Sequence, residues 1–170
     1  IGGYNRIQKI EKGGKATISW RHLGDLDLHV IVGNTGIRSP TSIVVGKHHP
    51  SMINRYKEQF FGACKKIELL ADRAEIAIKN KDVAELGKIM TENHRILADE
   101  LLVSHPKLDD CVNEALKAGA YGAKLSGAGW GGVMFALVPE EKLQKVAAAI
   151  ESTGCEVIIT EIGVPGARIE

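Results

Sequence analysis

The 170-residue sequence lacks the features that mark several protein classes. It has no apolar run long enough to span a bilayer and no secretion-signal pattern, so a membrane protein is not predicted. Its formal net charge is only +1, which favours neither nucleic acid nor an anionic membrane as a partner. Cys64, Cys111 and Cys155 lie far apart, without a CxxC pair or metal-site spacing. The sequence therefore predicts three reduced, buried thiols in a cytoplasmic protein.

The remaining composition is that of a soluble domain able to bury a core, since 44% of the residues are apolar and 25% are charged. The six histidines show no metal-ligand spacing, so no metal-binding residue is predicted. The chain begins at Ile1 within a strand-like stretch, which leads us to expect an incomplete or processed polypeptide.

The spacing of apolar residues predicts an α+β fold. Strands are predicted over residues 4–10, 15–20, 26–33, 122–126, 133–138 and 155–162. Helices are predicted over residues 53–78, 83–101, 106–116 and 139–150, and polar loops over 21–27 and 34–41. From Leu28 onward this is the ferredoxin-like split βαβ order, with extra helices in the first crossover. A β-hairpin precedes it.

Residues 124–133 are the most informative stretch, with the sequence Lys-Leu-Ser-Gly-Ala-Gly-Trp-Gly-Gly-Val between two predicted strands. Glycine backbones adopt positive φ and let N–H groups approach an anion closely, so this loop is a candidate phosphate site. It is neither a Walker A loop nor a Rossmann turn, because no Gly-Lys-Ser/Thr and no helical pattern follow the glycines. A purely structural tight turn is the alternative.

The same stretch resembles the third, C-terminal signature of the GHMP small-molecule kinases, usually Lys-Leu-Thr-Gly-Ala-Gly-Gly-Gly-Gly-Cys. Within that superfamily, further segments are similar to the mevalonate kinase family: Asn34-Thr35 with Thr41, and residues 93–97, 103–109 and 162–166. These segments occur in the family's order over nearly the whole chain. The resemblance implies the fold of a GHMP kinase C-terminal domain.

The departures from the family pattern are also informative. Ser126 stands where threonine is usual and keeps the hydroxyl, whereas Trp130 replaces a glycine and adds a large ring beside the loop. The family's Gly-Leu-Gly-Ser-Ser-Ala loop and its Gly-x-Asp motif with the catalytic aspartate are absent from this sequence. We therefore expect a C-terminal half, with residues 1–25 ending the N-terminal domain, residues 26–170 forming the C-terminal domain, and the catalytic aspartate upstream.

The resemblance also implies roles for individual residues. The residues expected to bind the nucleotide phosphates are Ser126, Gly127, Ala128 and Gly129. Asn34, Thr35 and His94 are expected to contact the acceptor substrate. The alternatives are Asx-turn chemistry for the first two and a buried, hydrogen-bonded structural role for the histidine. Lys124 and Arg38 are expected as solvated side chains, with contact to an anion as the alternative.

The activity that the resemblance implies is transfer of the γ-phosphoryl group of ATP, with Mg²⁺, to the primary hydroxyl of mevalonate for isoprenoid precursor synthesis. The implied partners are ATP, mevalonate, the missing N-terminal half and a second copy in a homodimer. The isolated chain is then expected to be inactive. The alternatives are another GHMP kinase, acting on phosphomevalonate or homoserine, or a stand-alone ferredoxin-like module that binds a small anion.

Overall fold

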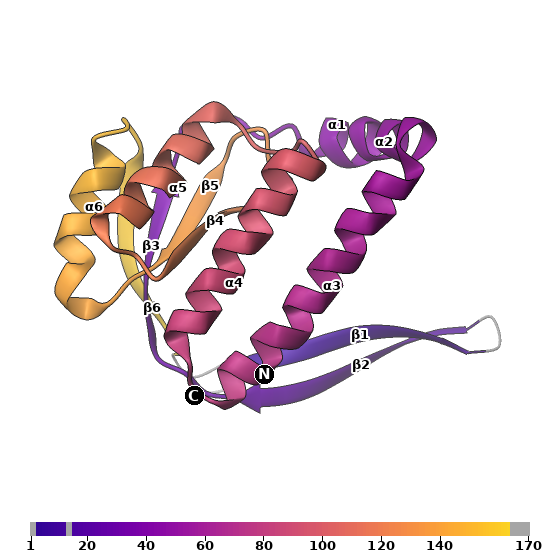
Figure 1. Ribbon diagram of the computed structural model, residues 1–170, viewed down its shortest axis with the longest axis horizontal. Coiled ribbons are helices and arrows are strands. Elements are labelled where there is room, and N and C mark those ends of the chain that lie inside the picture. The colour runs from indigo at the N-terminus through magenta and orange to yellow at the C-terminus, as the bar shows by residue number, and fades with distance from the viewer. Residues whose placement is uncertain (1–2, 13–14, 164–170) are drawn as a thin grey trace, which may run out of the picture.

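The computed structural model describes residues 3–12 and 15–163, which form two β-sheets with helices around them (Figure 1). The first sheet is an antiparallel hairpin of β1 (Tyr4–Lys12) and β2 (Lys15–Gly24). The second sheet consists of β3 (Leu28–Asn34), β4 (Gly122–Ser126), β5 (Val133–Leu137) and β6 (Glu156–Ile162). The helical segments are α1 (Thr41–Ile43), η1 (Val44–His48), α2 (His49–Arg55), α3 (Lys57–Lys79), α4 (Val83–Arg95), η2 (Ile96–Glu100), α5 (Pro106–Ala118), η3 (Glu140–Lys142) and α6 (Leu143–Glu151).

The second sheet has the strand order β4-β5-β3-β6, and all neighbouring strands are antiparallel. This is the ferredoxin-like arrangement, so the predicted fold class is confirmed. Helices α5 and α6 cover one face of the sheet (Figure 1). On that face Ile31, Leu125 and Met134 pack against Leu108 and Ile150 of the two helices, all at most 1% exposed.

Helix α4 lies along the free edge of β4, which would otherwise expose unpaired N–H groups. Gly87 and Gly122 permit this approach, because a Cβ on Gly122 would lie 1.7 Å from the carbonyl oxygen of Gly87. Thr91 Oγ1 then accepts a hydrogen bond from the N–H of Ala123 at 3.2 Å. The helix therefore satisfies the edge of the strand that leads into the glycine loop.

The hairpin is attached to α3 by a cluster of ion pairs around Glu75. Its carboxylate lies 2.6 Å from Lys79 Nζ, 3.0 Å from the guanidinium of Arg6 on β1 and 2.7 Å from that of Arg21 on β2. The hydrogen bond from Lys79, followed by those from the two arginines, lowers the pKa of Glu75 to about 2. One carboxylate thus joins both strands of the hairpin to the helix.

The predicted helices and strands match the observed ones closely. They differ at a few ends, where backbone conformation or strand pairing sets the boundary. Asp82 caps α4 as predicted, accepting a hydrogen bond from the N–H of Glu85 at 2.9 Å. The helix predicted over 53–78 is interrupted at Tyr56, where φ is −137°, so α3 begins one residue later. The loop predicted over 21–27 is wrong in its first half, because β2 continues to Gly24 by pairing with the start of β1.

Candidate functional site

The glycine loop, residues 127–132, joins β4 to β5 through left-handed backbone conformations. Positive φ angles occur at Gly127 (85°), Gly129 (89°), Trp130 (55°), Gly131 (130°) and Gly132 (80°). Gly129 has no room for a side chain, because a Cβ there would lie 1.9 Å from the carbonyl oxygen of Val103. Backbones of this kind form concave nests of N–H groups that bind anions.

The segment after β3 is hydrogen-bonded along one side of this loop. The N–H and the hydroxyl of Thr35 both donate to the carbonyl oxygen of Gly132, at 3.0 and 2.7 Å. The N–H of Gly132 donates to the Ile37 carbonyl at 2.8 Å, and Ser39 Oγ donates to the Gly129 carbonyl at 2.6 Å. The structure therefore brings the predicted phosphate loop and the predicted Asn34-Thr35 segment together.

Several loop donors are left for a ligand. Within the part of the chain that the structure describes, no hydrogen bond is donated by the N–H groups of Gly127, Ala128, Gly129 and Gly131 or by the hydroxyl of Ser126. The N–H groups of Trp130 and Gly132 donate instead to carbonyl oxygens of neighbouring segments. The loop is thus held by some of its amides while others remain available to an anion.

Asn34 and Thr35 make the local turns that the sequence offered as an alternative to substrate contact. Asn34 Oδ1 accepts from the N–H of Gly36 at 3.1 Å, and Thr35 Oγ1 accepts from that of Ile37 at 3.2 Å. Thr35 is 3% exposed, while Asn34 is half-buried and its Nδ2 donates to Glu156 at 3.3 Å. Thr35 therefore supports the glycine loop directly, and substrate contact by either residue stays a prediction.

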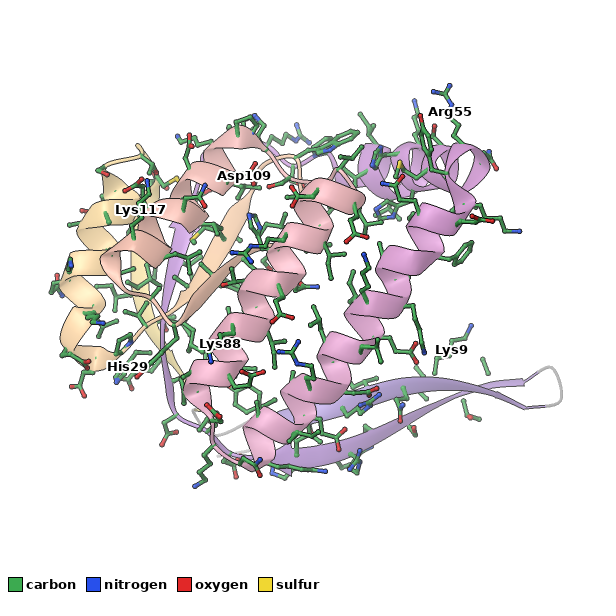
Figure 2. The ribbon with its side chains drawn as sticks, in the orientation of Figure 1. Lys9, His29, Arg55, Lys88, Asp109 and Lys117 are labelled. Carbon is green, nitrogen blue, oxygen red and sulfur yellow. A yellow bond between two sulfur atoms is a disulfide. The ribbon has the colours of Figure 1, made fainter. Side chains whose placement is uncertain are left out.

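His94 is buried, with both ring nitrogens close to partners in the chain. Nδ1 accepts from the N–H of Leu125 at 3.3 Å, and Nε2 lies 3.3 Å from Asp109 Oδ1. Figure 2 shows Asp109 on α5, beside the end of α4 that carries the histidine. Burial lowers the pKa of His94, although Asp109 opposes this shift. These contacts match the structural alternative, and a substrate contact stays a prediction.

Lys124 is mostly buried, so the expectation of a solvated lysine is wrong. It lines a groove of about 290 Å³ between α3 and α4, together with Asn93 and apolar side chains. Burial lowers the pKa of its ammonium group, since the charged form loses water there. Arg38 is exposed, as expected, and lies in the segment bonded to the glycine loop.

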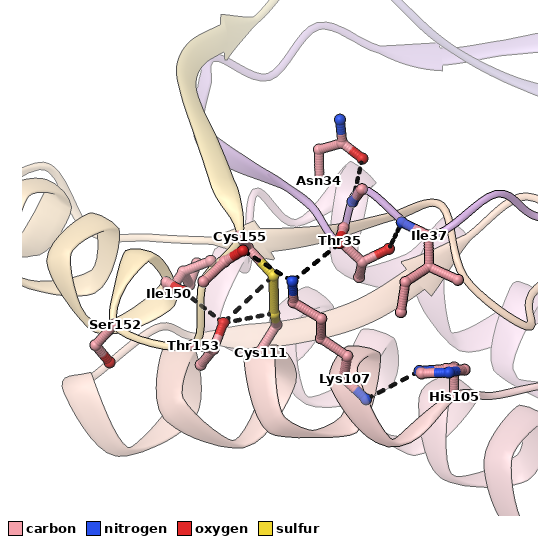
Figure 3. The surroundings of a disulfide bond; sticks show 12 residues. Asn34, Thr35, Ile37, His105, Lys107, Cys111, Ile150, Ser152, Thr153 and Cys155 are labelled. Carbon is pink, nitrogen blue, oxygen red and sulfur yellow. Dashed lines mark hydrogen bonds between the residues drawn. A yellow bond between two sulfur atoms is a disulfide. The ribbon is translucent and has the colours of Figure 1, made fainter.

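Cys111 of α5 and Cys155, just before β6, form a disulfide, so the prediction of three reduced thiols is wrong (Figure 3). They are 44 positions apart, and only the packing of α5 against the segment before β6 brings them together. Cys64 is free and exposed, not buried as predicted. Beside the disulfide, Lys107 Nζ donates to the carbonyl oxygens of Thr35 at 3.0 Å and Gly154 at 2.8 Å. This lysine, which the sequence reading missed, links α5 to the loop-supporting segment.

Comparison with known proteins assigns this arrangement to a family. Residues 74–155, which include α4, α5 and the glycine loop, match the family model for the C-terminal part of GHMP kinases. The chain carries a GHMP kinase C-terminal domain. The resemblance inferred from the glycine-loop sequence is thereby confirmed.

Several relatives of this GHMP domain are named mevalonate kinase, and a galactokinase of Pyrococcus furiosus is 45% identical over 44% of the chain. The mevalonate kinase of Thermococcus onnurineus is 38% identical over 181 residues, covering 100% of this chain and 49% of that protein. The mevalonate kinase of L. major, solved in complex with R-mevalonate, superposes with a TM-score of 0.82 at 24% identity, covering 95% of this chain and 50% of that one. That of Methanococcus jannaschii gives a TM-score of 0.68 at 27% identity, covering 86% of this chain and 45% of that one. The chain spans about half the length of these mevalonate kinases.

Two further observations concern membrane-spanning helices and metal-ligand groups among the described residues. No helix among them is long and apolar enough to cross a membrane. No group of three or more His, Cys, Asp or Glu side chains gathers among residues 3–12 and 15–163 in a way that could hold a metal ion. The donor set of the GHMP loop consists of N–H and O–H groups, which suit an anion and not a cation.

Proposed function

We propose that the chain is the C-terminal half of an ATP-dependent mevalonate kinase, which transfers the γ-phosphoryl group of ATP to the primary hydroxyl of mevalonate. The observation that carries the proposal is the glycine loop, in which the N–H groups of Gly127, Ala128, Gly129 and Gly131 donate no hydrogen bond to residues 3–12 and 15–163. Relatives named mevalonate kinase, aligned over the whole chain, support the choice of acceptor. In this proposal residues 1–25 end the N-terminal domain and residues 26–170 form the C-terminal domain.

The loop acts on the nucleotide by positioning and by neutralising charge, which are the main requirements of phosphoryl transfer. The free N–H groups of residues 127–129 donate to phosphate oxygens, and the Ser126 hydroxyl adds a further donor. Their arrangement is set before ATP arrives, because Thr35, Ile37 and Ser39 already hold the loop from one side. A preorganised donor set loses little energy to reorganisation during the reaction.

Mg²⁺ enters this proposal as the ion that accompanies ATP. The described residues offer no cluster of carboxylates for it, so they do not fit a metal site and we assign no step to the ion. On the acceptor side, Asn34 is the best-placed of the sequence-predicted contacts, because it ends β3 on the sheet face opposite α5 and α6 and is half-exposed. Thr35 and His94 support the loop and β4 through hydrogen bonds to Gly132 and Leu125, and their contact with the acceptor stays a prediction.

The half of the relatives that the chain does not span would provide the triphosphate-cradling loop and the catalytic aspartate. The 170-residue chain alone would then have no kinase activity and would bind ATP weakly. We also propose that the complete enzyme is a cytoplasmic homodimer. These statements rest on the family resemblance and on the relatives' length, about twice that of this chain.

An acceptor panel tests the proposal. The chain, joined to the N-terminal half of the enzyme, is assayed for ADP release from Mg²⁺-ATP with mevalonate, phosphomevalonate, homoserine or galactose. We expect release with mevalonate alone, and none from the isolated chain. Preference for phosphomevalonate or homoserine would instead assign another GHMP kinase. Turnover by the isolated chain at the rate of the joined enzyme would refute the division of roles between the halves.

A further inference from the structure

Trp130 is an unusual residue for its position in the glycine loop. Its φ is +55°, a left-handed conformation that bulky side chains rarely adopt and that persists only when surrounding contacts hold it. Leu102, on the turn that faces it, is also left-handed, with φ of +54°. Two non-glycine residues in this conformation therefore meet where the loop contacts residues 101–103, a segment separate from Thr35–Ser39.

Hydrogen bonds compensate for this backbone conformation. The N–H and the indole Nε1–H of Trp130 donate to the carbonyl oxygens of Val103 and Leu102, both at 2.8 Å. His48 Nε2 donates to the next carbonyl of the turn, that of Leu101, also at 2.8 Å. The imidazole and indole rings lie 4.9 Å apart between centroids at an interplanar angle of 57°. We call His48, Trp130 and residues 101–103 the clasp.

The clasp acts on the amides that the loop presents to a ligand. Val103, which accepts from Trp130, also occupies the space where a side chain on Gly129 would lie. The loop is thus fixed on two sides, by Thr35, Ile37 and Ser39 on one and by the clasp on the other. Between the two sides, the N–H groups of residues 127–129 have fixed directions although they donate to nothing in the described chain.

We propose that Trp130 is a positioning residue for phosphate binding, and that the clasp holds the loop amides in the arrangement that an ATP phosphate requires. The inference rests on the proposed function of the loop. A glycine, which is usual at this position in the family, would allow the loop several backbone conformations. The hydrogen-bonded indole of Trp130 restricts the loop to one. Trp130 itself contacts no phosphate in this account.

Two variants separate the parts of the clasp. Trp130→Gly removes the ring and the conformational restriction, while Trp130→Phe keeps a smaller aromatic ring beside His48 and removes the Nε1–H donor. Trp20→Phe is the matched control, since Trp20 is 57% exposed on the hairpin and makes no contact with the loop. Each is made in the 170-residue chain and in the joined enzyme.

The first measurement needs no ligand. Amide hydrogen exchange is followed in the chain at Thr35 and Gly132, whose N–H groups bond across the far side of the loop. We expect exchange at both to accelerate by about tenfold in Trp130→Gly and by less in Trp130→Phe, because loosening the clasp releases the whole loop. The Trp20→Phe control should exchange as the parent does.

The second measurement is steady-state kinetics of the joined enzyme with Mg²⁺-ATP and mevalonate. We expect the KM for ATP to rise by about tenfold in Trp130→Gly and about threefold in Trp130→Phe, with kcat within about twofold, because ground-state phosphate binding is what is lost. A merely structural tryptophan would lower thermal stability without moving the KM for ATP at temperatures where the variants remain folded.

The outcomes are distinct. Unchanged exchange at Thr35 and Gly132 in Trp130→Gly would overturn the clasp. Faster exchange with an unchanged KM for ATP would overturn its role in phosphate binding. If the joined parent enzyme transfers no phosphoryl group, the proposed function fails and the phosphate role of Trp130 fails with it. In that case the exchange measurement still decides whether the clasp holds the loop.

Discussion

At the residue scale, the clearest result is that two side chains of α4 satisfy the free edge of β4. Thr91 Oγ1 and His94 Nδ1 accept from the N–H groups of Ala123 and Leu125, which have no strand beside them. The sequence placed His94 on an apolar helical face but could not show which backbone groups lay opposite it. Two of the residues predicted to contact substrate, Thr35 and His94, also hydrogen-bond to the backbone around the loop, and substrate contact stays a prediction for both.

Removing the Thr91 hydroxyl tests this edge contact. Thr91→Val keeps the shape of the side chain but leaves the buried N–H of Ala123 without an acceptor, so we expect the free energy of unfolding to fall by about 1–3 kcal/mol. Thr91→Ser keeps the hydroxyl and serves as the control. Urea unfolding at neutral pH measures both. An equal fall in the free energy of unfolding of the two variants would show that side-chain packing, and not the hydrogen bond, stabilises this edge.

At the element scale, the close approach of α4 to β4 depends on Gly87. A Cβ at that position would lie 2.4 Å from the backbone carbon of Tyr121, so Gly87→Ala must displace the helix from the strand. We expect a loss of about 1–3 kcal/mol in the free energy of unfolding. Gly62→Ala in α3 is the matched control, because nothing lies within 4 Å of its Cβ and alanine favours a helix by about 1 kcal/mol. If Gly87→Ala were as stable as Gly62→Ala, the packing described for this edge would be wrong.

The attachment of the hairpin to α3 is predicted to be acid-sensitive. The pKa of Glu75 is about 2 in the folded chain against a usual 4.5, so its carboxylate stabilises the fold above pH 4.5 and loses this effect as the pH falls toward 2. We expect the urea midpoint of the parent to fall more between pH 6 and pH 3 than that of Glu75→Gln. Glu68→Gln, which removes only a surface pair with Lys65, should follow the parent. An equal fall of the urea midpoint in all three proteins would rule out Glu75 as the group responsible for the acid sensitivity.

Helices whose ends are marked by their own residues could be predicted from the sequence. Elements that depend on contacts with residues far away in the sequence could not. Asp82 before α4, and Pro106 and Gly119 around α5, mark helix ends through their own chemistry, and the structure confirms them. The helical residues 41–52 were missed, because that stretch has Gly46, Pro50 and few regularly spaced apolar residues. No local sequence pattern predicts a helix in such a segment.

The same distinction holds for the candidate site. Residues 124–133 identified the loop because four of its glycines lie within six consecutive residues. The partners of that loop come from residues 35–39, 48 and 101–103, which no local pattern connects to it. The burial of Lys124 likewise depends on α3 and α4 meeting over β4. Sequence therefore located the candidate phosphate loop, whereas the contacts that fix its shape required the fold.

At the scale of the whole molecule, the chain spans about half the length of its relatives, and its proposed contribution is a preorganised phosphate loop. It rests on a ferredoxin-like sheet, with α5 and α6 on one face and α4 along the edge of β4. The hairpin at its beginning leaves Ile7, Ile18 and Trp20 more than half exposed. An apolar stripe of this kind on a two-stranded sheet fits a proposal in which further chain packs there.

Amide NMR of the ¹⁵N-labelled chain during titration with tripolyphosphate tests the central claim most directly. The account predicts saturable shifts of the Gly127, Ala128, Gly129 and Gly131 resonances, because these N–H groups donate to no other described residue. Gly129→Ala, which forces a Cβ against the Val103 carbonyl, should abolish those shifts while Gly62→Ala keeps them. Saturable binding that leaves the four resonances unmoved, or that survives Gly129→Ala unchanged, would contradict the assignment of the glycine loop as the phosphate site.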